Sequence, residues 1–264
     1  MSVLEAFLLG ILQGLTEFLP VSSSGHLELG KVWLDVSNAN DTTFTVVAHA
    51  GTALSTIIVF WDRVKQLLLA PFHSRKSESF QYLLFVLIAA VPVVVLGLLA
   101  RDAVDALFNG NLLLVGSCLL VTSGLLFFAS RARDRGGEVT GRSAWIIGLA
   151  QAVAVLPGIS RSGATISTAL MLGIRRDRAA RFSFLIVLIP IFGVMGLDGL
   201  KLATGAETLK LGWAPLLTGF ITSFFVGLLA CRWMVRIVQR GGLVPFSLYC
   251  LLVGLVTLYF GFAG

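Results

Sequence analysis

Charged residues are scarce in this chain. Only 13% of its 264 residues are Asp, Glu, Lys or Arg, whereas soluble domains carry about 25%. Hydrophobic residues make up 56%, and the mean hydropathy is +0.91. This composition excludes an ordinary soluble enzyme and a disordered chain.

Cysteine and histidine are also few. The three cysteines, Cys118, Cys231 and Cys250, lie inside apolar stretches, which indicates packing roles and excludes a disulfide framework. The three histidines are scattered at positions 26, 49 and 73, so the ligand spacing of a zinc site is missing. Walker and dinucleotide-binding glycine patterns are missing too.

The net charge of +6 comes from basic residues in short loops between apolar runs. We therefore interpret it as a signal of membrane orientation, and nucleic-acid binding is not expected. Six runs approach the roughly 20 apolar residues that a spanning helix needs. They are residues 44–60, 80–99, 111–129, 182–200, 213–231 and 246–263.

Two further apolar regions, 3–34 and 144–172, are interrupted at residues 18–26 and 156–163. Their halves are mostly too short to cross a membrane alone. Four loops (61–79, 130–143, 173–181 and 232–245) hold 15 of the 20 basic residues, which predicts that these loops are cytoplasmic.

Both flanks of residues 144–172 are basic, so this region is expected to enter the membrane from the cytoplasm and return to it. Counting the spans backwards from the cytoplasmic loops places the first part of the chain outside, so residues 3–34 are expected to form a hairpin that enters the membrane from outside. The predicted fold is an all-α integral membrane protein with six transmembrane helices and two re-entrant helical hairpins. It forms one membrane domain, 1–264, made of two inverted repeats, 1–130 and 144–264, each a hairpin followed by three spans.

Internal similarity supports the repeat. The segment ILQGLTEFLPVSSSG at 11–25 lines up with LAQAVAVLPGISRSG at 149–163, with Gln13 matching Gln151 at an offset of 138 residues and Pro20 matching Pro157 at an offset of 137. Inverted repeats with broken helices place the functional site near the midplane, where the two breaks meet.

Polar and ionisable residues, which are costly within a bilayer, concentrate at these two breaks. The candidates are Gln13, Glu17, Ser22, Ser23, Ser24 and His26 at the first break, and Ser160, Arg161, Ser162 and Thr165 at the second. Taken singly, a serine after proline is commonly a helix N-cap, a buried histidine is commonly a packing residue, and a buried Glu–Arg pair can be structural. These interpretations do not account for the gathering of a carboxylate, an imidazole, hydroxyls and a guanidinium on the two breaks taken together.

Such a set of residues suits a phosphate ester or anhydride. Helix N-termini attract anions, and the planar fork of Arg161 can hold two phosphoryl oxygens. A serine hydroxyl or the His26 imidazole can attack phosphorus or activate water. Glu17 is a hard oxygen ligand suited to Mg²⁺ or Ca²⁺.

Residues 13–26 resemble the (Glu/Gln)-x-x-x-Glu box, with its serine-rich, His-terminated tail, of the undecaprenyl-diphosphate phosphatase family of the bacitracin-resistance type. Residues 157–165 resemble that family's Pro-Gly-x-Ser-Arg-Ser-x-x-Thr box. The resemblance implies an inner-membrane enzyme, dependent on a divalent cation, with its pocket open to the periplasm. Its substrate would be undecaprenyl diphosphate, hydrolysed to the monophosphate and inorganic phosphate. This activity recycles the lipid carrier for peptidoglycan synthesis and confers bacitracin resistance.

The resemblance also implies roles for single residues. Glu17 would be the essential acid and the metal or base group, and Arg161 the phosphate clamp. Ser23 and His26 would be nucleophile and general acid–base in one order or the other. Supporting substrate contacts would come from Gln13, Ser22, Ser24, Ser160, Ser162 and Thr165. Glu28 and His49 receive no assignment.

Two rival functions fit parts of the pattern. A polyprenyl-phosphate transporter or flippase would use the same architecture, and an intramembrane serine hydrolase would use the serines but give Arg161 no purpose. The choice between Mg²⁺ and Ca²⁺ stays open, as does the oligomeric state, with a homodimer among the alternatives.

Overall fold

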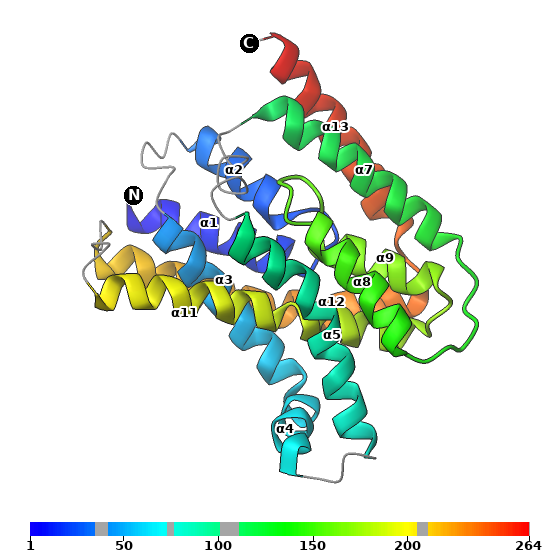
Figure 1. The fold of residues 1–264 in the computed structure, drawn as a ribbon. Helices are drawn as coiled ribbons and strands as arrows, with labels where there is room; N and C mark the ends of the chain where they lie inside the picture. Colours follow the sequence, from blue (N-terminus) through cyan, green and yellow to red (C-terminus); the bar gives the residue numbers. More distant parts are fainter. Residues whose placement is uncertain (35–41, 73–76, 101–110, 205–210, 264) are drawn as a thin grey trace.

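The computed structural model describes residues 1–34, 42–72, 77–100, 111–204 and 211–263 (Figure 1). These ranges are almost entirely helical, and the one pairing of extended residues within them is an isolated bridge between Gly137 and Ile174. The helices are α1 (Val3–Thr16), α2 (Ser23–Trp33), α3 (Thr42–Val59), α4 (Trp61–Leu69), α5 (Glu78–Leu99), α7 (Leu112–Ser130), α8 (Gly141–Val153), α9 (Arg161–Met171), α10 (Arg176–Ile186), α11 (Leu188–Ala203), α12 (Trp213–Arg240) and α13 (Val244–Ala263), with a 3₁₀ turn at Ala70–Phe72.

Within the described ranges, five helical segments are long and apolar enough to cross a membrane: α5, α7, residues 176–197 of α10 and α11, α12, and α13. The bent pair of α3 and α4 adds a sixth if it is counted as one span. Large apolar side chains such as Phe128, Leu229 and Phe262 face outward, as expected where lipid replaces water. The prediction of an all-helical membrane protein is confirmed in this coarser form.

The segment boundaries differ from the predicted runs at three places, one of which is the run 213–231, since α12 continues to Arg240 through most of the predicted loop 232–245. The predicted run 182–200 is helical from Arg176 onward and is interrupted at Val187. Pro190 explains the interruption, because it has no N–H to donate and its ring clashes with the carbonyl four residues earlier. After Val59 the chain turns by 87° into α4, a bend that the apolar run 44–60 does not reveal.

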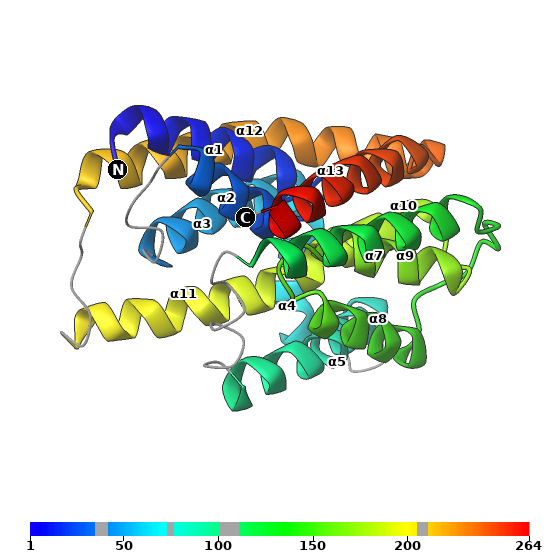
Figure 2. The same ribbon diagram turned by 90° about the horizontal axis from the view of Figure 1, so that it is seen from above.

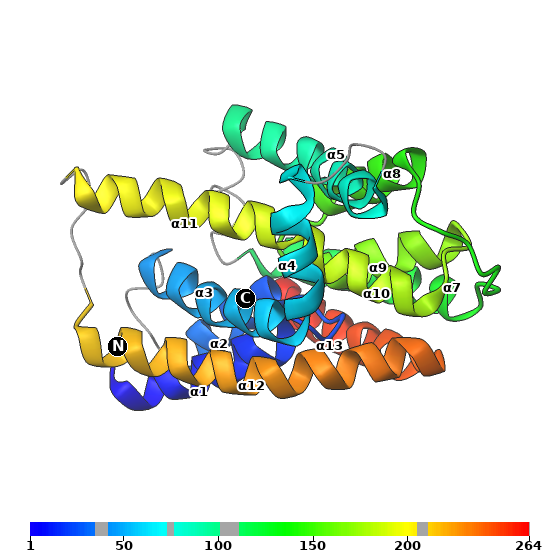
Figure 3. The same ribbon diagram turned by 90° about the horizontal axis from the view of Figure 1, so that it is seen from below.

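Several helix ends gather at two opposite ends of the molecule, as the two turned views show (Figures 2 and 3). The N-terminus, the last turn of α11 and the first turn of α12 lie at one end. The α7–α8 connection, the α9–α10 connection and the last turn of α12 lie at the other. The long helix α12 therefore runs from one end of the molecule to the other.

Small residues allow the closest helix contacts. A Cβ at Gly10 in α1 would lie 2.9 Å from Thr222 Cβ in α12, and one at Gly148 in α8 would lie 2.5 Å from the Ala89 carbonyl oxygen in α5. Helix α1 thus packs closely on α12, and α8 on α5. Close approach through small residues is typical of helix packing in membranes.

The non-helical segment after α1 touches the first turn of α9, and the one after α8 touches the first turn of α2. A Cβ at Gly25 would lie 3.3 Å from Gly158 Cα, and one at Gly163 would lie 3.4 Å from Pro20 Cβ. Thr122 of α7 satisfies backbone groups of the second segment, because its hydroxyl donates to the Gly158 carbonyl oxygen and accepts from the Ser160 N–H, each at 3.0 Å. Buried backbone needs such partners wherever helical bonding stops.

Candidate functional site

The Glu17 carboxylate is the centre of the polar cluster at the first break. It directly follows α1, and its Oε2 accepts hydrogen bonds from Gln13 Nε2 at 3.0 Å and from the Ser23 hydroxyl at 2.8 Å. His49 Nε2 of α3 lies 3.5 Å from the same oxygen. Only 8% of the Glu17 side chain is exposed, so these groups take the place of water around the carboxylate.

Gln13 is fully buried, one helical turn before Glu17. Its Nε2 is used by Glu17, whereas its Oε1 has no hydrogen-bond partner in the part of the chain that the structure describes. A buried amide oxygen without a partner is costly. Here the amide oxygen of Gln13, whose Nε2 contacts the Glu17 carboxylate, is free to bind a metal ion or to accept a hydrogen bond.

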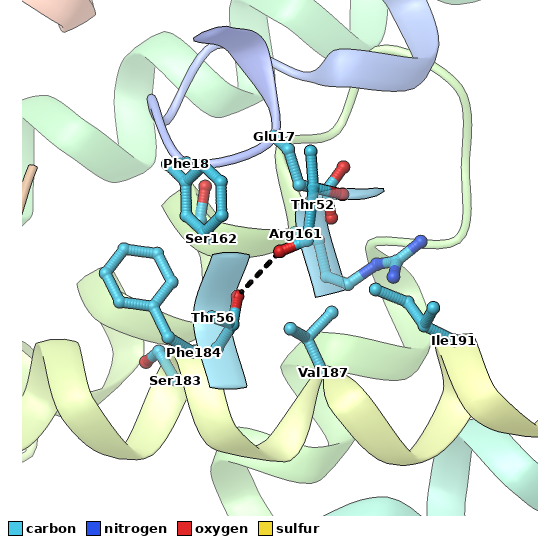
Figure 4. Close-up of a pocket in the computed structure, with 10 residues that line it drawn as sticks. All are labelled: Glu17, Phe18, Thr52, Thr56, Arg161, Ser162, Ser183, Phe184, Val187 and Ile191. Carbon is cyan, nitrogen blue, oxygen red and sulfur yellow. Dashed lines mark hydrogen bonds between the residues drawn. The ribbon is translucent and has the colours of Figure 1, made fainter. Parts of the chain in front are cut away.

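A small cavity lies beside Glu17, and residues of both breaks line it. Figure 4 shows a more polar side with Glu17, Thr52 and Arg161, and opposite it a side that carries the rings of Phe18 and Phe184. The lining comprises Glu17, Phe18, Thr52, Thr56, Arg161, Ser162, Ser183, Phe184, Val187 and Ile191. Among the described residues, the Arg161 guanidinium has no hydrogen-bond or ion-pair partner, so its five donors are available to an anion.

The backbone of each break ends in a capped helix start. The Ser22 hydroxyl accepts from Gly25 N–H at 3.3 Å, and the Ser160 hydroxyl accepts from Gly163 N–H at 3.0 Å. The next residue in each case is the first of a helix: Ser23 in α2 and Arg161 in α9. The two residues that approach Glu17 and the cavity therefore sit at helix N-termini, where the helix dipole favours anions.

The remaining serines and the threonine have partners within the protein. Ser24 pairs with Ser22 at 3.3 Å, and Ser162 pairs with Ser160 at 3.3 Å. Thr165 donates to the Arg161 carbonyl oxygen at 2.9 Å. Of the proposed supporting contacts, Ser162 alone lines the cavity. Substrate binding by the others stays a prediction, and their visible role is to cap and bridge the two helix starts.

His26 does not line this cavity. Its Nδ1 donates to the Ser22 carbonyl oxygen at 2.9 Å, and its Nε2 lies 2.7 Å from the Tyr249 hydroxyl of α13. The two rings stack with their centroids 5.6 Å apart. Both ring nitrogens are thus occupied, and a catalytic role for His26 stays a prediction.

Three residues at the site were not among the sequence candidates. His49, Thr52 and Thr56 share one face of α3 at helical spacing; His49 contacts Glu17, and the two threonines line the cavity. The available signal was a titratable residue inside an otherwise apolar run, followed by hydroxyls three and seven positions later. Ser183 of α10 also lines the cavity, and its buried hydroxyl has no partner among the described residues.

The residues around Glu17 fit a hard divalent cation. Mg²⁺ is commonly held by one or two carboxylates together with substrate phosphates and waters. Glu17 supplies the carboxylate, and the unpartnered Oε1 of Gln13 supplies a second oxygen. Within the described ranges, no group of three His, Cys, Asp or Glu side chains forms a metal cage, so an ion here would need oxygens from the substrate.

Comparison with known proteins points to one family. A family model described as bacitracin resistance protein BacA matches residues 6–256. A protein of Christiangramia forsetii named undecaprenyl-diphosphatase is 47% identical over 268 residues, covering 100% of both chains. Proteins of the same name from Bacteroides fragilis and Parabacteroides distasonis are 43% and 42% identical, covering 96% and 98% of both chains.

Proposed function

The chain belongs to the bacitracin resistance protein BacA family, and we propose that it hydrolyses undecaprenyl diphosphate to undecaprenyl phosphate and inorganic phosphate in the cavity between Glu17 and Arg161. The single observation that carries this assignment to the cavity is the Arg161 guanidinium, unpaired among the described residues, on the same side of the cavity as the hydrogen-bonded Glu17 carboxylate (Figure 4). A carrier that only bound the lipid would not need a serine hydroxyl bonded to that carboxylate. The hydrolysis recycles the lipid carrier for peptidoglycan synthesis, and it confers bacitracin resistance.

In the proposed reaction Ser23 is the nucleophile. Its hydroxyl already donates to Glu17 at 2.8 Å, so the carboxylate can take the proton as the oxygen attacks the terminal phosphorus. The bond from that phosphorus to the bridging oxygen breaks, undecaprenyl phosphate leaves, and water then releases inorganic phosphate from Ser23. Arg161 holds the phosphoryl oxygens with two parallel N–H donors and stabilises the charge that develops on them.

His26 is the proposed general acid–base group of the second step. The substrate would have to displace the Tyr249 hydroxyl from Nε2 for this role. Such rearrangement is compatible with a structure without substrate, since catalytic hydrogen bonds often form only in the complex. Ser162 and the orphaned Ser183 hydroxyl would add donors to the phosphate oxygens.

A divalent cation, Mg²⁺ or Ca²⁺, would be held by Glu17 with the Gln13 amide oxygen. When bound, it would neutralise charge on the diphosphate. The remaining supporting residues, Ser22, Ser24, Ser160 and Thr165, would keep the two helix starts in register around the anion.

We also propose the finer topology: six spans and two re-entrant hairpins, α1–α2 and α8–α9, in two inverted repeats at 1–130 and 144–264. Matched contacts support it. Gly10 and Gly148 are 138 positions apart. At each of them, the glycine lets its helix pack closely against a helix from the other half of the chain. Ser22 and Ser160, also 138 apart, make the same capping bond.

The distribution of basic residues supports an orientation of the protein in the membrane. The end of the molecule that holds the α7–α8 and α9–α10 connections carries the arginine-rich segments 130–143 and 173–181 (Figure 2). We propose that this end is cytoplasmic, that the protein lies in the inner membrane, and that the cavity opens toward the periplasm.

Release of inorganic phosphate from undecaprenyl diphosphate tests the proposed function. Detergent-purified protein should release phosphate with Mg²⁺ or Ca²⁺ and lose this activity in excess chelator. If folded protein releases none in either condition while vesicles containing it move labelled polyprenyl phosphate across the bilayer, the transporter alternative replaces the hydrolase.

A further inference from the structure

His49 of α3 approaches the Glu17 carboxylate through one of its two ring nitrogens. Its Nδ1 lies 2.7 Å from the Thr45 carbonyl oxygen, and because a carbonyl can only accept, Nδ1 carries the hydrogen. In the neutral ring, Nε2 therefore presents a lone pair. Nε2 lies 3.5 Å from Glu17 Oε2, so in the neutral ring two electron-rich atoms are close to each other.

A shared cation removes this conflict. Resting on the proposed function, we propose that His49 Nε2 and Glu17 Oε2 are two protein ligands of the same divalent cation. Two ligands that each lie about 2.1 Å from one ion are about 3 to 3.5 Å apart for angles between octahedral and tetrahedral. The observed separation of 3.5 Å fits the upper end of this range.

The surroundings of His49 match those of a metal ligand. Metal-binding histidines almost always donate their other ring N–H to a carbonyl or carboxylate, which fixes the tautomer. In His49 the Nδ1–H donates in this way to the Thr45 carbonyl oxygen. The unpartnered Oε1 of Gln13 provides a third donor atom beside the same carboxylate.

An imidazole ligand changes which ion this site prefers. Carboxylates and water suit Mg²⁺ and Ca²⁺, whereas imidazole binds first-row transition metals, Mn²⁺ included, more readily than it binds Mg²⁺. A site with one carboxylate, one amide oxygen and one imidazole should therefore bind Mn²⁺ more tightly than Mg²⁺. Mn²⁺ is also paramagnetic, so its ligands can be identified directly.

The test is pulsed electron paramagnetic resonance of Mn²⁺ bound to the purified, untagged protein. We expect modulation from one directly bound imidazole nitrogen in the wild type and its loss in His49→Gln, which keeps side-chain length and polarity on α3. The Mn²⁺ dissociation constant of His49→Gln should rise about tenfold or more. His26→Ala is the matched control, because both nitrogens of His26 are bonded within the protein, and it should keep the nitrogen signal.

Bound Mn²⁺ without imidazole modulation in the wild type would overturn the proposal, and so would a signal that persists in His49→Gln. The first result would leave His49 as an ion-pair partner of Glu17, and the second would assign the bound imidazole to another histidine. Metal-dependent phosphate release is measured separately. The assignment of His49 as a ligand can therefore fail while the proposed phosphatase activity stands. If the wild-type protein released no phosphate with metal present, that result would count against the proposed phosphatase activity and not against the ligand assignment.

Discussion

Arg161→Lys separates the geometry of the guanidinium from its charge. Arg161 is the first residue of α9, and its guanidinium has no partner among the described residues. The substitution keeps the positive charge and removes the planar fork, so one of two charge-assisted hydrogen bonds to the phosphoryl group is lost. One such bond contributes about 1.5–3 kcal/mol, which corresponds to a loss of roughly tenfold to a hundredfold in rate. Arg161→Ala, which also removes the charge, should lose more.

The fold should survive both changes. Arg, Lys and Ala differ by only a few tenths of a kcal/mol in helix propensity, and the cap of α9 is made by Ser160 and the Gly163 N–H, not by Arg161. The assay is the initial rate of phosphate release from saturating farnesyl diphosphate, with thermal unfolding as the control. If Arg161→Lys keeps more than half of the wild-type rate, the bidentate clamp is refuted.

Three further predictions concern the first break and the helix packing. Glu17→Gln should lower phosphate release by about 10²-fold or more, and near-normal release would remove Glu17 from the reaction. Ser22→Ala should cost about 1 kcal/mol of stability, because it removes the cap of α2; unchanged thermal unfolding would contradict this. Gly148→Val should destabilise the protein by about 1–3 kcal/mol, since its side chain would meet the Ala89 carbonyl. Gly193→Val, with open space around it, should unfold as the wild type does, and equal losses in both would argue against the close α5–α8 contact.

Hydropathy was sufficient to predict the helical membrane class, because an apolar run near 20 residues matches the thickness of a bilayer and exceeds the usual length of a buried strand. It did not predict helix boundaries that depend on backbone chemistry. The interruption at Val187 arises from Pro190 inside an apolar run, and α10 begins among arginines that are typical of a loop between spans. A bend after Val59 leaves no hydropathy signal, because Trp61 and Asp62 fit the end of a span equally well.

The contents of the site were predicted where residues are near neighbours in the chain. Gln13, Glu17 and Ser23 lie within about ten positions of one another, and their hydrogen bonds follow from helical spacing and the break. The contacts that were missed join distant segments. His49 reaches Glu17 through the packing of α3, and Tyr249 reaches His26 across 223 positions. A local sequence pattern does not predict contacts between residues so far apart in the chain.

The central claim is that one cavity, built from both halves of the chain, holds the diphosphate. A double-mutant cycle of Ser23→Ala and Arg161→Lys, measured as phosphate release, tests it most directly. If both residues act on the same phosphoryl group, the double variant should lose much less than the product of the two single losses, because groups that act as a unit are not additive. If the losses multiply to within about a factor of two, the two residues act independently, and a shared site is contradicted.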